Sequence, residues 1–296
     1  MKRIILIENY KGHDLGPQII SVLKVVKSID DSEKEIVLDF SNYSWSPPVL
    51  SVLLSCIIES NKIEFKGIKN INYLKTIFFP GGLECSTFED IEARLSNYSN
   101  KSYLPIVKFS TSTISEIAKI SSEIIGQVAK MIRQIANLPI NYYSAINYIF
   151  SEITDNIIEH SKTNYGWISF QYYKENGFID VCIADAGRGL LKSYLEYDGN
   201  KEYGHVVTDR LAMIEATNGS STKNLKERGF GLPTSRKMII DGLKGKYIYC
   251  SGTSLLNNDD VMTIPDNYYY NGTFVILRIP CNQPIQSFNY IDYIEC

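Results

Sequence analysis

Carboxylate, amide and imidazole side chains recur at helical spacing between Asn141 and Ser161. Glu152, Asn156 and His160 stand four residues apart, so in a helix they share one face. The apolar residues of the segment form a neighbouring stripe: Ile146, Ile149, Phe150, Ile153 and Ile157. A carboxylate accepts a proton from water, and an amide oxygen suits a hard cation such as Mg²⁺. The polar face is therefore either a site for such chemistry or a solvated surface, and the spacing leaves both open.

A second group of residues follows an apolar strand and reads Asp185-Ala-Gly187-Arg-Gly189. Glycines allow the main chain to approach a flat ligand, while the carboxylate accepts a hydrogen bond from an amino group. A turn in which the aspartate bonds its own backbone has the same residues. By itself this motif therefore does not decide between a ligand site and a turn.

A third motif, Arg-Gly-Phe-Gly-Leu-Pro, occupies residues 228–233 and opens a helix that we expect to run to Leu243. The free N–H groups at a helix start attract anions, phosphate above all. A glycine-rich turn before a proline-initiated helix is the alternative. Farther along, Asn271-Gly272-Thr273 begins the last long strand and by itself predicts only a hairpin turn.

In this chain order the four motifs resemble the GHKL ATPase superfamily, with its Bergerat ATP-binding fold. The resemblance covers about residues 139–280. Around Glu152 and Asn156 it is most similar to the anti-sigma-factor serine kinases. It implies ATP and Mg²⁺ as cofactors, with Asn156 coordinating the Mg²⁺ and Glu152 acting as the general base. Asp185 would bind the adenine amino group, and Thr273 would support that contact.

The glycine motifs acquire roles from the same resemblance. Gly187 and Gly189 would let the base seat. Four residues would place the helix start against the phosphates: Arg228, Gly229, Gly231 and Leu232. The segment 190–228 would be the mobile ATP lid. Lysine and arginine side chains in and beside this lid either reach the γ-phosphate or are merely solvated: Arg188, Lys223, Lys226, Arg228, Arg236 and Lys237.

The elements that must position these residues predict an α+β protein. Short β-rich and helical segments alternate over residues 1–105, which favours a small α/β domain. Within the polar segment 101–113 we place the boundary to a second domain, residues 106–296. There we expect the ATP-binding α/β sandwich, a mixed sheet with helices on one face.

The N-terminal segment Ile36–Ser41, followed by a helix, is similar to STAS domains. A STAS domain that is phosphorylated carries a serine at the start of that helix. Here the stretch reads Ser46-Pro47-Pro48-Val49, so proline stands at or beside the acceptor position, with Ser44 close by. The resemblance therefore favours a role in recognition or dimerisation.

A long helical segment, 110–136, carries an apolar stripe: Ile114, Ile117, Ile120, Ile124, Val128, Met131 and Ile135. The stripe either pairs two subunits in a homodimer or packs within the chain. None of the three histidines, His13, His160 and His205, lies on this helix, which argues against a sensor histidine kinase. Three functions remain open: an ATP hydrolase that controls a protein partner, a serine or threonine kinase, and a non-hydrolysing ATP-binding switch.

Composition narrows the class of protein further. Lys and Arg number 30 against 33 Asp and Glu, so nothing indicates nucleic acid as a partner. The six cysteines show no CxxC pair, which argues against a zinc site and favours reduced thiols in the cytoplasm. The start, Met1–Ile7, is too short in apolar residues for a signal peptide or a membrane anchor.

Overall fold

The structure is a computed structural model that describes residues 2–8, 10, 12–43, 45–67, 71–197, 203–220, 231–282 and 288–294. The α-helices are α1 (Leu15–Asp30), α2 (Pro48–Asn61), α3 (Ile71–Thr76), α4 (Phe88–Ser96), α5 (Ser115–Ala136), α6 (Ile140–His160), α7 (Gly189–Leu195), α8 (Asp209–Thr217) and α9 (Gly231–Lys237). A π-helical turn, η2 (Met238–Gly242), continues α9, and short 3₁₀ turns are η3 (Pro265–Asn267) and η4 (Tyr290–Tyr293).

The strands are β1 (Arg3–Leu6), β2 (Ile36–Asp39), β3 (Glu64–Lys66), β4 (Leu83–Glu84), β5 (Val107–Ser110), β6 (Tyr165–Tyr173), β7 (Phe178–Asp185), β8 (Lys246–Gly252), β9 (Ser254–Asn257), β10 (Asp260–Thr263) and β11 (Tyr270–Pro280). Strands β1, β2 and β3 make a small parallel sheet. The larger sheet has the order β10-β9-β8-β11-β7-β6-β5-β4, and only its β4–β5 pair is parallel. The expected α+β class with a mixed sheet is confirmed.

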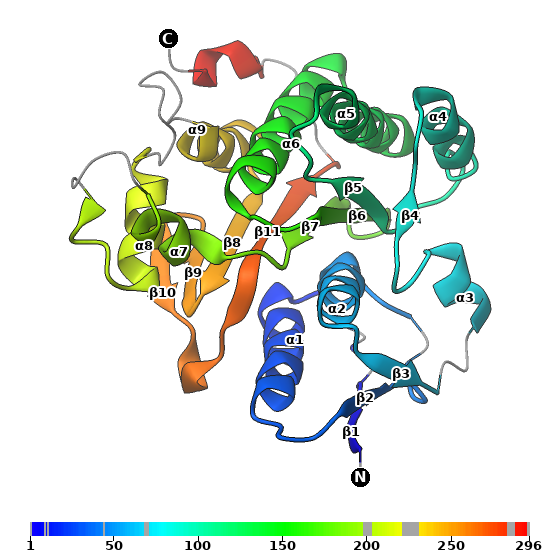
Figure 1. Ribbon diagram of the computed structural model, residues 1–296. Helices are drawn as coiled ribbons and strands as arrows, with labels where there is room; N and C mark the ends of the chain where they lie inside the picture. The colour runs from blue at the N-terminus through cyan, green and yellow to red at the C-terminus, as the bar shows by residue number, and fades with distance from the viewer. Residues whose placement is uncertain are drawn as a thin grey trace.

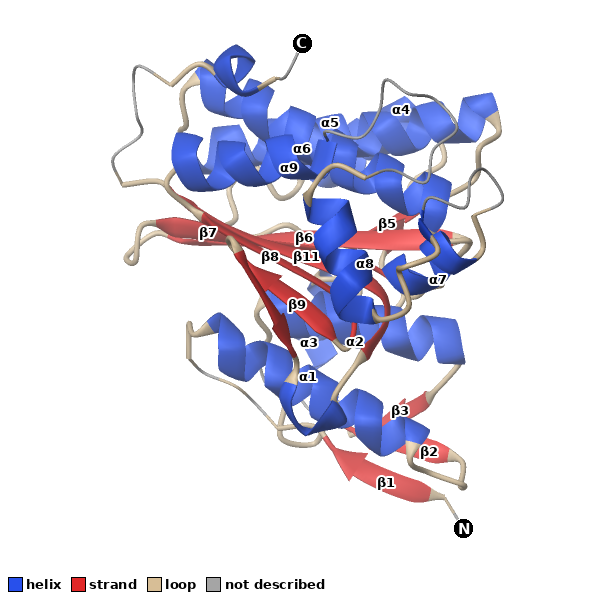
Figure 2. Cartoon of the chain, turned by 90° about the vertical axis from the view of Figure 1, so that its left-hand side faces the viewer, coloured by secondary structure: helices blue, strands red, loops and turns tan. Residues whose placement is uncertain are grey.

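The elements stack in layers (Figure 1). Helices α4, α5, α6 and α9 cover one face of the larger sheet, which we call the upper face. Helices α1 and α2 lie against its other, lower face, and the small sheet lies beyond them (Figure 2). The two N-terminal helices are therefore enclosed between two sheets.

The upper core is made by the apolar stripe of α6 against the sheet. All five stripe residues that the sequence indicated are buried: Ile146, Ile149, Phe150, Ile153 and Ile157. The α5 stripe enters the same core through Ile124, Val128 and Met131, whereas Ile114 at its start is 63% exposed. Most of this stripe therefore packs within the chain.

The lower core joins the N-terminal helices to the larger sheet. Because side chains alternate across a strand, Val181 and Ile183 of β7 point into the upper core, while Cys182 points down. On the lower side Cys182 belongs to one buried cluster with Leu53 of α2 and Phe274 of β11. Sheets buried on both faces read as near-continuous apolar runs. One core is thus shared by the two halves of the chain.

A buried ion pair anchors the loop before α1 to the same face. The guanidinium of Arg278 on β11 donates to both carboxylate oxygens of Asp180 at 2.7 and 2.8 Å, and also to the carbonyl of His13 at 2.6 Å. Asp180 is 1% exposed, and burial raises the pKa of its carboxyl group although the Arg278 bonds oppose the rise.

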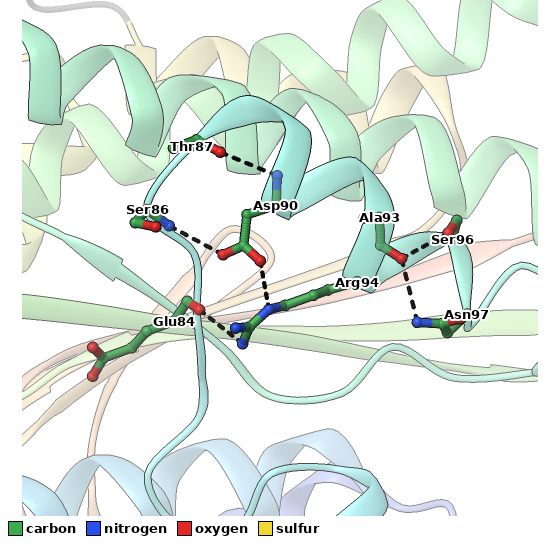
Figure 3. Close-up of polar contacts among 8 residues, drawn as sticks. All are labelled: Glu84, Ser86, Thr87, Asp90, Ala93, Arg94, Ser96 and Asn97. Carbon is green, nitrogen blue, oxygen red and sulfur yellow. Dashed lines mark hydrogen bonds and ion pairs between the residues drawn. The ribbon is translucent and has the colours of Figure 1, made fainter.

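The chain enters the larger sheet before residue 105, because β4 pairs with β5. Helix α4 follows β4 and begins with a reciprocal cap: Thr87 accepts from the N–H of Asp90, and Asp90 accepts from that of Ser86 (Figure 3). Arg94 holds Asp90 at 2.6 Å and donates to the carbonyl of Glu84 on β4 at 3.3 Å. These contacts fix α4 on the larger sheet. The limits 1–105 and 106–296 stay a prediction.

Two segments differ from the expected elements. The long helix begins at Ser115 rather than at residue 110, because residues 107–110 form β5, with Val107 and Phe109 buried. The segment 190–228, expected as a loop, contains most of α7 and all of α8 in its described parts. Among the described residues, no helix combines the length and apolar composition needed to cross a bilayer.

Candidate nucleotide-binding site

The polar face of α6 is only partly open to solvent. Glu152, Asn156 and His160 are half-buried, whereas Asp155 and Glu159, which flank them, are exposed. A wholly solvated face would leave all five exposed to a similar degree. Neighbouring elements therefore partly cover the three aligned side chains.

Glu152 reaches the start of α9, where the glycine-rich motif lies. A Cβ placed on Gly231 would lie 1.8 Å from Oε2 of Glu152, so the carboxylate packs directly on that backbone. Leu232 is half-buried and packs against the upper core. The structure thus brings Glu152 and Gly231 together. Four residues named from the sequence lie outside the described residues: Lys223, Lys226, Arg228 and Gly229.

Asp185 is the last residue of β7 and is 1% exposed. Its carboxylate accepts hydrogen bonds from the N–H of Gly187 at 2.7 Å and from the hydroxyl of Thr273 on β11. Burial raises the pKa of Asp185 to about 6, and the bonds from Thr273 and Gly187 oppose that rise. The structure thus places Thr273 in direct contact with the Asp185 carboxylate, and the role of both residues toward a nucleotide stays a prediction.

Gly187 and Gly272 let three backbone segments approach one another: the end of α6, the loop after β7 and the start of β11. A Cβ on Gly187 would lie 2.1 Å from the carbonyl oxygen of Ser161, directly after α6. Gly272 has φ +91°, and a Cβ there would lie 2.3 Å from the carbonyl oxygen of Asp185. No larger residue fits either place without a shift of backbone. Gly189 begins α7.

Ser251 on β8 is a site residue that the sequence did not reveal. Its hydroxyl accepts from the N–H of Leu190 at 2.9 Å and donates to the carbonyl of Gly272 at 3.1 Å. Thr273 on the middle strand, β11, is paired with Asp185 on β7 at one side and with Ser251 on β8 at the other. Ser251 therefore joins the start of α7 to the loop beside Asp185. Only knowledge of the strand order could have singled it out.

The geometry agrees with the comparison to known families. Residues 142–283 match the family described as Histidine kinase-, DNA gyrase B-, and HSP90-like ATPase. The match supports a GHKL-type ATPase domain over these residues. This segment runs from α6 through β11 and contains every candidate site residue. No curated protein matches the chain. At the level of the superfamily, the match supports ATP binding with ATPase or kinase activity and does not distinguish the two.

Arg188 bonds to the C-terminal end of α6 and to Glu196. Its Nε donates to the carbonyl of His160 at 2.7 Å, and a second guanidinium nitrogen donates to Glu196 at 2.7 Å. Its backbone N–H donates to the carbonyl of Ser161 at 2.8 Å. A cation at a helix C-terminus satisfies the free carbonyls of the last turn. Arg188 thus fastens the Asp185 loop to the end of α6.

A magnesium site in this segment would need only one or two oxygen ligands from the protein. Within the ranges that the structure describes, no three His, Cys, Asp or Glu side chains are grouped as a complete metal site. Mg²⁺ is commonly held by one or two protein oxygens together with substrate phosphates. Asn156, half-buried one helical turn from Glu152, carries a side-chain oxygen of this kind.

In the N-terminal half, the hydroxyl of Ser46 is not available at the surface. Ser46 is 3% exposed, and its hydroxyl contacts that of Tyr43, while its carbonyl accepts from Tyr73 at 3.1 Å. Pro47 caps α2 and Pro48 begins it. A kinase cannot reach this serine in the fold described. Ser44 lies outside the described residues.

Proposed function

We propose that the protein is a Mg²⁺-dependent ATP-binding and hydrolysing regulatory protein whose nucleotide state controls a protein partner. The carrying observation is the contact of Glu152 with Gly231, because it brings a general base to the helix start that attracts phosphate. The buried Asp185–Thr273 pair, at the ends of neighbouring strands, provides the acceptor for a purine amino group.

Each residue has a separate task in this proposal. Ionised Asp185 accepts from the adenine amino group with an electron pair that Gly187 and Thr273 leave open. Backbone N–H groups at the start of α9 receive the phosphates. Bound Mg²⁺ supplies charge neutralisation of the phosphates, and Asn156 would hold it. Glu152 takes the proton of the attacking water.

A protein serine or threonine kinase of the anti-sigma-factor type is the second candidate. The same carboxylate of Glu152 can deprotonate a serine hydroxyl instead of water, so the described site favours neither acceptor. A passive ATP-binding switch is less well supported, because it would have no use for a carboxylate against Gly231.

Incubation with γ-labelled ATP, alone and with lysate proteins, separates these functions. Label released as free phosphate by the protein alone supports hydrolysis. Label that appears on a protein serine or threonine supports the kinase. Bound but uncleaved ATP under both conditions would leave the switch. The variant Glu152→Gln is the control for contaminating enzymes, because it retains the size of the side chain and loses the base.

A further inference from the structure

Helix α1 holds the segment that leads into the nucleotide site. We call residues 264–272 the connector: they comprise the link between β10 and β11 and the first three residues of β11. The ammonium group of Lys27 on α1 donates to the carbonyl of Asp266 at 2.7 Å. It also lies 5.3 Å from the centre of the Tyr268 ring, within range of a cation–π contact. One α1 side chain thus binds the connector at two points.

Two further contacts secure the connector against the N-terminal helices. The hydroxyl of Tyr269 donates to the carboxylate of Asp30 at the end of α1. The next residue, Tyr270, is 1% exposed and lies in the lower core with Cys56 of α2. Four contacts in a row therefore place the connector on α1 and α2.

The connector ends at the carboxylate that would receive the purine. Gly272 packs against the carbonyl of Asp185, and the hydroxyl of Thr273 binds the Asp185 side chain. A shallow cleft is lined both by Asp30 of α1 and by Ala186, the residue after Asp185. The N-terminal helix and the purine end of the site are therefore joined through a few consecutive residues.

We propose that Lys27 and Asp30 are positioning residues for the purine end of the nucleotide site, so that the N-terminal half sets its affinity. This inference rests on the proposed function. With the connector fastened to α1, Thr273 and Gly272 are held where Asp185 needs them before the nucleotide arrives. Release of the connector leaves those residues to be ordered on binding, which weakens affinity. By reciprocity, bound nucleotide strengthens the contacts of α1.

The effect belongs to binding rather than to the chemical step. Lys27 and Asp30 approach the purine end, whereas Glu152 and Gly231 stand at the phosphate end. A weakened connector therefore raises the dissociation constant and KM and leaves kcat nearly unchanged.

Three α1 variants test the proposal in the full-length protein. Lys27→Met keeps the stem and removes the charge, and we expect the dissociation constant for ATP to rise about fivefold. Lys27→Arg keeps a donor and a cation and should restore most of the affinity. Lys24→Met changes an exposed lysine of the same helix and is the matched control. Tyr269→Phe, which loses the bond to Asp30, is the independent second variant.

Calorimetry with ATP, steady-state KM and kcat, and hydrogen exchange of residues 264–272 are the measurements. Faster exchange in the connector with a raised KM, an unchanged kcat and rescue by Lys27→Arg supports the proposal. Faster exchange with unaltered ATP affinity would overturn it and leave the proposed function intact. A wild-type protein that binds no ATP would overturn both.

Discussion

The carboxylate of Glu152 packs on the backbone of Gly231, where a Cβ would come within 1.8 Å of Oε2. One residue comes from the middle of α6 and the other from the first position of α9, so the packing of these two helices sets the distance between the proposed base and the proposed phosphate site. If these roles are correct, we expect a change that separates α6 from α9 to alter catalysis before it alters purine binding.

The base assignment predicts a separation of binding from turnover. Glu152→Ala should bind ATP with near wild-type affinity and lose at least about 100-fold in kcat, because the substitution removes the proposed base. Glu159→Ala, an exposed carboxylate of the same helix, is the control and should keep its kcat. Titration calorimetry and phosphate release measure the two quantities. Normal turnover by Glu152→Ala would remove the proposed role.

The purine contact predicts nucleotide selectivity. Asp185→Asn should abolish measurable ATP binding, because the carboxylate that accepts the amino proton is replaced by a group with its own N–H donors. Wild-type protein should discriminate against GTP, whose carbonyl would face the carboxylate. Competition between the two nucleotides checks both statements. Equal affinity for ATP and GTP would contradict the assignment of Asp185.

The raised pKa of Asp185, about 6 against an ordinary 3.8, predicts a pH dependence of stability. The folded, nucleotide-free protein binds this proton more tightly than the unfolded chain. The contribution is therefore fully present below pH 4 and is lost as the pH rises through about 6. Relative to Asp185→Asn, the wild type should lose about 2 kcal/mol of unfolding free energy between pH 4 and pH 7. Denaturant titrations of both proteins give the difference, and parallel pH profiles would exclude it.

The contact of Gly187 with Ser161 predicts a steric effect. Gly187→Ala puts a methyl group 2.1 Å from the Ser161 carbonyl and should cost about 1–3 kcal/mol of stability. Gly16→Ala, in helix α1 with nothing within 4 Å of the added carbon, should stabilise by about 0.5–1 kcal/mol. Chemical denaturation of the pair measures both. A Gly187→Ala protein as stable as wild type would show that the loop shifts freely.

The shared lower core predicts that the ATPase domain depends on the N-terminal half. A protein truncated to residues 106–296 lacks α1, α2 and β4, which exposes Phe274, Ile276 and Cys182 of the sheet. Such a patch favours association of the sheets. We expect aggregated material in sedimentation, while the full chain stays dispersed. A monomeric, cooperatively unfolding fragment would contradict this expectation.

The sequence foretold those parts of the site that are local in the chain. Glu152 and Asn156 share a helix, and Asp185 and Gly187 share one turn, so spacing alone was informative. Ser251 escaped notice because its importance comes from strand pairing with Thr273, 22 positions later. A lone serine in an apolar strand carries no signal of that kind.

The placement of α1 and α2 could not be inferred for a similar reason. The alternation of strand and helix over residues 1–105 correctly indicated α/β structure, and the match to residues 142–283 supports the GHKL resemblance. Neither pattern states which face of a sheet receives a helix. That choice depends on the complementarity of distant surfaces such as Leu53 and Phe274, which only the folded chain brings together.

The order of strands has a consequence for how the molecule is made. Strand β11 is the last strand of the described chain, yet it occupies an inner place between β8 and β7. During synthesis, β7 and β8 leave the ribosome before β11, so the centre of the sheet stays incomplete until β11 pairs with them. Closure requires pairing between residues far apart in the chain, which makes folding slow and leaves open strand edges exposed meanwhile. The nascent protein is thus expected to need chaperones until β11 has emerged from the ribosome.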